Sequence, residues 1–206
     1  MHQMNLNPWI SMWTNPRKTI REIVNISPRK GFFLLAVFFG LQYLLNFAHT
    51  FSLGIHFDPI FILIVSIVVS PILGYFWFYL FGACLYYSGK MLKGQSRYFQ
   101  ILSSMAWSSV PYILTVFMWF LFMVTSTYSV FIQQTDGFTF FFISLVILIS
   151  AIWSLVLILK CLMEVQEFSC WRAIGNYLLG LVFYYIALFA VAACFALISR
   201  LIVMFV

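Results

Sequence analysis

Charged side chains are scarce in this sequence, and their scarcity excludes a water-soluble fold. Asp, Glu, Lys and Arg make up 8% of the 206 residues, whereas about a quarter of a typical soluble domain is charged. A soluble fold would have too few polar groups to cover its surface, so lipid must surround most of the chain. The length allows one compact bundle and leaves no room for a separate soluble catalytic domain.

Residues that carry acid–base chemistry are also few. The chain has five acidic residues and three histidines, and it contains no H-E-x-x-H, no G-x-S-x-G, no Walker-type glycine loop and no dinucleotide-binding fingerprint. Its cysteines, Cys84, Cys161, Cys170 and Cys194, form no C-x-x-C pair and no Cys/His metal spacing. The sequence therefore predicts a protein that is not an enzyme and that uses no metal, cofactor or disulfide.

Long apolar runs are what the chain has in abundance, since 64% of its residues are hydrophobic. A helix that crosses a bilayer needs about 20 mostly apolar residues. Five segments meet this requirement: Phe32–Leu53, Ile60–Tyr87, Phe99–Thr125, Phe138–Leu159 and Tyr177–Phe205. We therefore expect an all-α fold, a polytopic membrane bundle of five transmembrane helices that occupies residues 31–206.

The formal net charge of +6 is unevenly distributed and predicts an orientation. Lys and Arg gather in cytoplasmic segments of membrane proteins. Basic residues occur before the first span (Arg17, Lys18, Arg21, Arg29, Lys30), in the second connector (Lys90, Lys93, Arg97) and in the fourth (Lys160, Arg172). The first and third connectors carry only Asp58 and Asp136, and Arg200 in the last span is the exception to the alternation. We expect a cytoplasmic N-terminus, an external C-terminus, and contact with anionic lipid headgroups rather than nucleic acid.

Residues 1–30 form the cytoplasmic or interfacial segment of this layout. Asn15 followed by Pro16 is typical of a helix start. Ile20, Ile23 and Val24 share one face of that helix, and the basic residues lie mostly on the other. This pattern, with two tryptophans upstream, favours an amphipathic helix in the membrane interface with its basic side toward lipid phosphates. A solvated basic leader that only sets the topology remains the alternative.

Small residues and prolines mark how the spans could pack. Ser66, Ser70 and Gly74 lie one helical turn apart on the second span, with Gly82 two turns further along the same stripe, and these four residues predict a smooth groove for another helix. Pro71 lies on the same span and should kink it. Pro111 divides the third span into a serine-rich half and a bulky apolar half, which predicts either a kinked helix or a partly re-entrant one.

Three polar residues on the first span form a candidate intramembrane site. Gln42, Asn46 and His49 are spaced so that they share one helix face, and polar atoms are costly in hydrocarbon. One interpretation is a wet groove that binds a lipid headgroup or a substrate. The other, which we favour, is hydrogen bonding between helices, with the serines of the third span as the expected partners.

A second candidate site lies on the expected cytoplasmic face. Lys160 and Glu164 are one turn apart on an expected cytoplasmic helix extension and could pair, and Glu167 could reach Arg172 or a basic residue of the second connector. The cluster could be a solvated set of ion pairs or a docking surface. The candidate docking or headgroup-binding residues are Arg17, Lys18, Arg21, Lys90, Lys93, Arg97, Glu164, Glu167 and Arg172.

Three stretches resemble the YIP domain family, the Ypt/Rab-interacting proteins, in its bacterial form. They are Trp13-x-x-Pro16-Arg17-x-x-Ile20-Arg21, Gly94-Gln95-Ser96-x-x-Phe99 leading through Ser108-Ser109-Val110-Pro111, and Phe168-Ser169-x-x-Arg172-Ala173. The resemblance implies a small helical membrane protein of trafficking or membrane-organising type. Eukaryotic members reside in early secretory membranes and bind prenylated GTPases, but this chain lacks their long N-terminal region and D-L-Y-G-P motif, so GTPase binding is not expected.

Two functional hypotheses follow. The first is a non-enzymatic, membrane-organising scaffold of the bacterial inner membrane that binds lipids or protein partners, or a second copy of itself, at its cytoplasmic face; early secretory membranes of a eukaryote are the alternative location. The second is a transporter or channel for a small molecule or lipid that uses the polar stripe of the first span. Against it, no internal repeat is evident and no charge lies mid-membrane.

Overall fold

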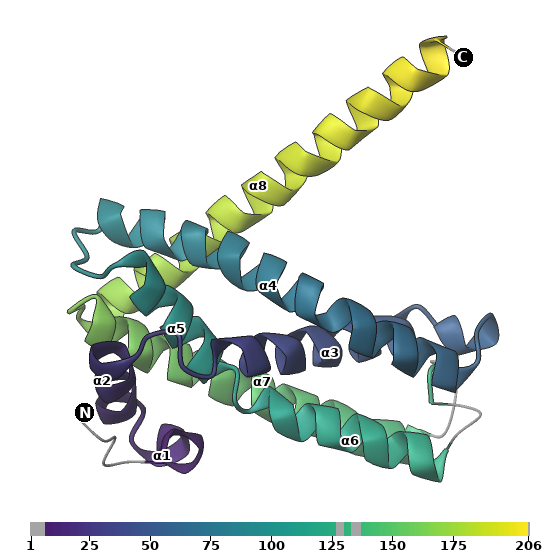
Figure 1. The fold of residues 1–206 in the computed structure, drawn as a ribbon, viewed down its shortest axis with the longest axis horizontal. Coiled ribbons are helices and arrows are strands. Elements are labelled where there is room, and N and C mark those ends of the chain that lie inside the picture. The colour runs from purple at the N-terminus through teal and green to yellow at the C-terminus, as the bar shows by residue number, and fades with distance from the viewer. Residues whose placement is uncertain (1–6, 127–129, 133–136, 206) are drawn as a thin grey trace.

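The computed structural model describes residues 7–126, 130–132 and 137–205, with no side-chain description for residues 137–140, 195, 197–199 and 201–205. The described part is helical (Figure 1). Its elements are α1 (Pro8–Thr14), α2 (Pro16–Ile26), α3 (Phe32–Thr50), the 3₁₀ helix η1 (Leu53–Ile55), α4 (Pro59–Met91), α5 (Tyr98–Ser108), α6 (Tyr112–Thr125), α7 (Gly137–Val165) and α8 (Cys170–Phe205).

Five spans are present if the third is counted as a broken helix. Helices α3 and α4, and the stretches Phe141–Val165 of α7 and Cys170–Cys194 of α8, are each long and apolar enough to cross a bilayer. Helices α5 and α6 meet that requirement only together, with a bend of 40° between them. The predicted all-α polytopic bundle is therefore confirmed.

The helix ends differ from the predicted span ends. Helix α4 continues to Met91, α7 continues to Val165, and α8 already begins at Cys170. Lys90 and Arg172 are thus helical rather than in loops, because Lys and Arg are good helix formers and a helix need not end where the apolar run ends. Lys160 lies on the expected helical extension of α7. The third connector, with Asp136, lies largely outside the described residues.

Helices α3 and α4 come into close contact at small residues. A Cβ atom added to Gly40 would lie 2.1 Å from the carbonyl oxygen of Ser70, and one added to Gly74 would lie 1.9 Å from that of Ala36. Both obstacles are backbone atoms, so no rotamer change could make room. The small-residue groove predicted on the second span is therefore real, and α3 fills it.

Pro71 and Pro111 have different structural consequences. Helix α4 continues through Pro71, and the Ser70 hydroxyl donates a 3.0 Å hydrogen bond to the Ile67 carbonyl, which has lost its usual backbone donor at position 71. Pro111 instead stands at the break between α5 and α6. There Ser108 and Ser109 donate hydroxyl hydrogen bonds of 2.8 and 2.6 Å to the Met105 and Ala106 carbonyls.

The N-terminal helices are docked against the bundle. Helix α2 is amphipathic as predicted, and its Ile20 and Ile23 are fully buried. These residues pack in the core to which α5 and α7 contribute, so protein rather than lipid covers the apolar face. Trp9 of α1 meets the Trp107 ring edge-on at 5.1 Å, which extends the docking to α1. Asn15 precedes α2 but makes no side-chain capping bond.

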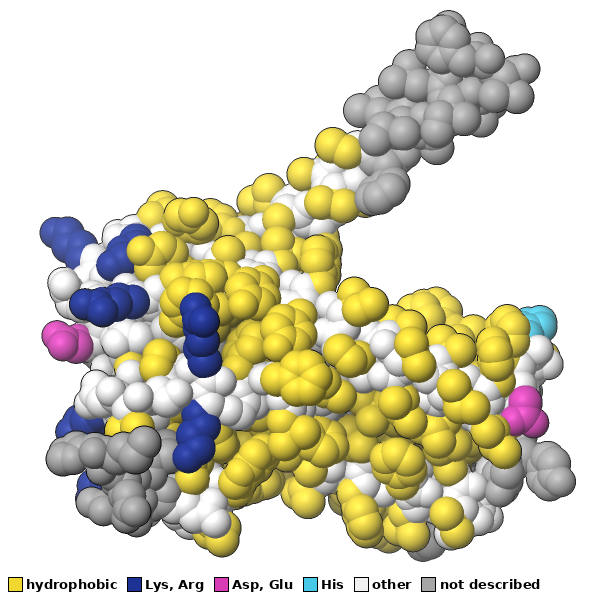
Figure 2. All heavy atoms as spheres, viewed as in Figure 1, with side chains coloured by type: hydrophobic (Ala, Val, Ile, Leu, Met, Phe, Trp, Pro, Cys, Tyr) yellow, Lys and Arg dark blue, Asp and Glu magenta, His cyan; other side chains and the backbone are white. Residues whose placement is uncertain are grey.

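The two ends of the bundle differ in charge. In Figure 1, α2, the α4–α5 connection and the α7–α8 connection lie at one end, and the connection between α3 and α4 lies at the other. Figure 2 shows Lys and Arg side chains gathered over the first of these ends. The C-terminal half of α8 leaves the bundle (Figure 1).

Candidate functional site

Cationic side chains gather at one end of the bundle, which we call the basic end. Helix α2, the α2–α3 linker, the last turn of α4 and the α7–α8 connection bring it together (Figures 1 and 2). Its basic residues are Arg17, Lys18, Arg21, Arg29, Lys30, Lys90, Lys93, Arg97, Lys160 and Arg172. Asp58 lies at the opposite end, where its side chain caps α4 by accepting a 2.8 Å hydrogen bond from the Ile60 amide.

An arginine pair from α2 holds one carboxylate of α7. The Nε of Arg17 donates to Glu164 Oε2 at 3.0 Å, and the Nε of Arg21 donates to Oε1 at 2.5 Å. Glu164 is largely buried, with 10% of its side chain exposed, whereas the arginines are 53% and 65% exposed. No ion pair joins Lys160 to Glu164 among the described residues, because α2 lies against α7 and its two guanidinium groups bind the carboxylate.

A polar cleft opens beside this pair. Arg17, Arg21, Glu164 and Glu167 line it together with Met163 and Phe168, and its volume is about 480 Å³. No ion pair joins Glu167 to Arg172 among the described residues, contrary to the expectation from their spacing. Two of the predicted docking residues, Arg17 and Arg21, therefore share one carboxylate, which balances only one of their two charges, and Glu167 remains at the rim.

The other predicted basic residues stand on the surface of the basic end. Lys18, Lys93, Arg97 and Arg172 are exposed. Lys90 is exposed too, and its Nζ donates a 3.2 Å hydrogen bond to the Gly94 carbonyl and lies 5.5 Å from the centre of the Tyr86 ring. The cations are consequently spread over one surface rather than focused on one point.

Under this surface lies a buried polar seam that the sequence reasoning missed. Gln166 is 1% exposed, and its side-chain amide lies so close to Gly89 and Gly94 that a Cβ atom on either glycine would overlap it. Neither amide atom has a hydrogen-bond partner within the described part of the chain. Nearby, Ser88 donates a 2.6 Å hydrogen bond to the Asn176 side-chain oxygen. The local sequence gave no signal of this burial, because Gln166 stands between Val165 and the charged Glu167.

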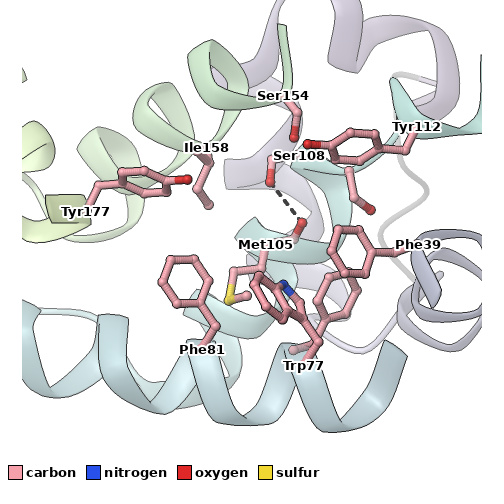
Figure 3. Close-up of a pocket in the computed structure, with 11 residues that line it drawn as sticks. Phe39, Trp77, Phe81, Met105, Ser108, Tyr112, Ser154, Ile158 and Tyr177 are labelled. Atoms are coloured by element: carbon pink, nitrogen blue, oxygen red, sulfur yellow. Dashed lines mark hydrogen bonds between the residues drawn. The ribbon is translucent and has the colours of Figure 1, made fainter. Parts of the chain in front are cut away.

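A small cavity lies inside the bundle next to the break at Pro111 (Figure 3). Its volume is about 130 Å³. One wall is aromatic and the other carries hydroxyl groups, with the Tyr112 and Ser154 oxygens turned toward each other in Figure 3. The aromatic residues are Phe39, Trp77, Phe78 and Phe81, and the hydroxyl residues are Ser108, Ser109, Tyr112, Ser154 and Tyr177.

The hydroxyl groups of this cavity could hold a small polar molecule. None of its described lining residues is a carboxylate, histidine, lysine or cysteine, so the cavity has no group that could activate a hydroxyl near neutral pH. Its volume is comparable to that of a few water molecules, each of which takes about 30 Å³ in the liquid.

The polar stripe of the first span lies elsewhere. Gln42 and His49 are 5% and 4% exposed, and Asn46 is half-buried. The His49 ring lies 5.5 Å from the Trp119 ring of α6. The apolar residues around the stripe, such as Leu45 and Trp119, belong to one buried cluster formed by α3, α6 and their neighbours. None of the three polar residues lines the central cavity.

Comparison with known proteins gives a family and no closer relative. No curated protein and no solved structure matches the chain. A family model, that of the Yip1 domain, matches residues 10–202, which extend from within α1 through most of α8 and include all three of the stretches that resembled the family. The chain therefore belongs to the Yip1 domain family of integral membrane proteins.

Proposed function

We propose that this protein is a non-enzymatic, membrane-organising scaffold of the bacterial inner membrane whose basic end faces the cytoplasm. In this role it gathers anionic phospholipids and docks protein partners at that face. Membership of the Yip1 domain family and the apolar helices support a membrane role. The narrower assignment depends on the basic end.

The observation that carries the proposal is the set of exposed cations at one end of the bundle. Lys18, Lys90, Lys93, Arg97 and Arg172 are all exposed there. Each Lys or Arg near an anionic surface contributes about 1 kcal/mol of attraction at most, and the effect fades within a Debye length of about 10 Å. Five such residues are enough to enrich anionic lipid around the protein without a deep pocket.

Exposed aromatic residues at the same end fit this placement. Trp171, at the start of α8, is 82% exposed and stands next to Arg172, and Tyr87, in the last turns of α4, is 65% exposed. Tryptophan and tyrosine prefer the level of the lipid headgroups, where one part of the ring system is wet and the rest is apolar. They would hold the basic end at the depth of the phosphates.

The test is lipid enrichment around the reconstituted protein. We expect fluorescent phosphatidylglycerol, but not phosphatidylcholine, to concentrate around the protein in giant vesicles, and this enrichment to fall as salt rises. The triple variant Lys90→Gln, Lys93→Gln, Arg97→Gln should lose most of the enrichment, whereas Asp58→Asn at the opposite end should keep it. Equal distribution of both lipids around the unaltered protein would refute the lipid part of the proposal.

Partner docking has its own test. Cross-linking in native membranes should recover specific proteins through lysine residues of the basic end, and deletion of the gene should alter membrane shape. Recovery of none, together with unchanged membranes, would contradict the scaffold role.

Transport is the second candidate, and the central cavity beside the broken span is the observation that favours it. A break in a spanning helix is a common feature of substrate sites in transporters. If the polar stripe of α3 serves the pathway, Gln42→Leu, Asn46→Leu and His49→Leu together should abolish solute flux or lipid scrambling in vesicles. Flux by the unaltered protein equal to that of protein-free vesicles would exclude this function.

A further inference from the structure

A second cleft lies on the flank of the bundle close to the basic end, and the functional sites described above do not use it. It is formed where the α2–α3 linker meets α4 and the start of α5, and its volume is about 320 Å³. Figure 2 shows cationic side chains on the hydrophobic flank next to this end. None of the described residues that line the cleft is acidic.

The rim of the cleft carries one cation in a fixed position. The Arg29 guanidinium carbon lies 4.5 Å above the centre of the Phe99 ring. A guanidinium group that stacks on a ring keeps its N–H groups in plane and available, and in-plane N–H pairs match the geometry of phosphate oxygens. Arg29 is exposed, so these donors can reach a ligand at the surface.

The backbone around Arg29 is held by the bundle. The indole Nε1 of Trp107 donates a 3.1 Å hydrogen bond to the Lys30 carbonyl, and Trp107 itself is 1% exposed. Gly31 has a φ of +72°, and a Cβ atom there would lie 2.9 Å from the Trp107 ring. The linker is thus anchored immediately after the position where Arg29 projects, which lowers the ordering cost of binding.

The interior of the cleft is apolar and open to the surrounding bilayer. Phe33 is 60% exposed, and the Tyr75 and Tyr79 rings stack at 6.1 Å on the facing side of α4. Both the first span and the broken third span begin near the rim, at Phe32 and Tyr98. The rim therefore lies where phosphates are found, and Phe33 and Tyr75 lie deeper, beside the hydrocarbon chains.

We propose that this cleft binds one phospholipid, with Arg29 on its phosphate and the aromatic groove along the upper part of an acyl chain. The proposal rests on the proposed function, because it identifies one specific lipid position within the general attraction of the basic end. Charge complementarity identifies the occupant. The cleft has a cation at the depth of the phosphates and, below it, an aromatic groove that opens to lipid. These features are complementary to a molecule that is anionic at one end and apolar at the other.

The test is lipid retention by the full chain in detergent, counted by native mass spectrometry with added phosphatidylglycerol. We expect one lipid to remain bound under conditions that remove the others. Arg29→Gln should weaken that binding about tenfold, since a charge-assisted phosphate contact is lost. Phe33→Ala should weaken it less. Lys160→Gln, which removes an exposed cation of the same end away from the cleft, should retain the lipid as the unaltered protein does. The unfolding temperature without lipid establishes that each variant is folded.

The outcomes separate this inference from the broader proposal. Equal lipid retention by Arg29→Gln and Lys160→Gln would overturn the proposal that the cleft binds a phospholipid. If phosphatidylglycerol is still enriched around the protein in vesicles, the scaffold proposal remains intact. Competition by soluble glycerol phosphate at the same concentration as the lipid also overturns it, because the acyl chain would then contribute nothing. Tenfold weaker retention in Arg29→Gln alone, without competition by glycerol phosphate, supports it.

Discussion

At the scale of single residues, the packing of α3 against α4 depends on the side chains that are smallest. Gly40 lies against the Ser70 carbonyl, and Gly74 lies against that of Ala36, so each helix backbone fits into the other. In lipid, where apolar side chains gain nothing by leaving the solvent, close contact of this kind is a main source of helix association.

We therefore expect Gly74→Val to destabilise the bundle. The added side chain would displace backbone atoms, and overpacking costs about 1–3 kcal/mol even where side chains can adjust. Thermal unfolding in detergent measures the change. Gly175→Ala is the control, because a Cβ atom there would meet only a Leu92 methyl group at 3.9 Å. Equal unfolding temperatures for the two variants would show that α3 and α4 are not packed this closely.

The sequence predicted half of this contact. The spacing of Ser66, Ser70 and Gly74 indicated a groove on α4. It did not indicate which helix packs into that groove, because small residues occur in α8 as well as at Ala36 and Gly40 of α3. Gln166 was missed for a related reason. Its burial depends on Gly89 and Gly94, which are more than seventy residues away, and only the fold brings them to its side chain.

At the scale of helices, α4 compensates for its internal proline locally. Without an N–H at Pro71, the Ile67 carbonyl would be unpaired in a span that lipid surrounds, and the Ser70 hydroxyl supplies the missing donor. A serine immediately before the proline thus allows the helix to continue, whereas α5 and α6 separate at Pro111.

A double-mutant cycle tests this compensation. We expect Ser70→Ala to lower the free energy of unfolding by about 1 kcal/mol, the usual worth of such a hydrogen bond. In the Pro71→Ala background the same change should cost much less, because the restored backbone N–H pairs with Ile67. Additive effects in the thermal or denaturant unfolding of the four proteins would mean that Ser70 does not substitute for the lost donor.

Helix α2 is held by its ion pairs as well as by its apolar face. Its amphipathic pattern was evident in the sequence, but its partner was not, since Arg17 and Glu164 are 147 residues apart. Arg17 and Arg21 are more than half exposed, so solvent screens the pair and its contribution is modest.

Glu164→Gln should therefore loosen α2 without unfolding the bundle. We expect faster hydrogen exchange over residues 16–26 and faster tryptic cleavage at Arg17 and Arg21, with an effect of at most about 1 kcal/mol. High salt should reproduce part of the change in the unaltered protein. Glu167→Gln, at the rim of the same cleft, is the matched control, and identical exchange in the two variants would indicate that Glu164 does not hold the helix.

At the scale of the whole molecule, the features that follow from composition were predictable and those that follow from assembly were not. Apolar runs determine the span count, and the alternation of basic and non-basic connectors matches the basic end. The central cavity is lined by side chains of helices α3 to α8, so no local sequence pattern predicts it. Pro111 indicated a break but not its angle, which depends on how α5 and α6 pack on α7.

The predicted orientation can be tested with cysteines. Cys170 is exposed at the start of α8 on the basic end, and Cys84 and Cys161 are buried. If that end is cytoplasmic, a membrane-impermeant maleimide applied to intact cells should leave Cys170 unlabelled until the membrane is permeabilised. Cys194, on the membrane-spanning part of α8, is replaced by serine to remove its signal. In this background Phe57→Cys, at an exposed position between η1 and α4, should be labelled from outside before permeabilisation. The opposite labelling order would place the basic residues outside the cell, where the anionic cytoplasmic leaflet could not attract them.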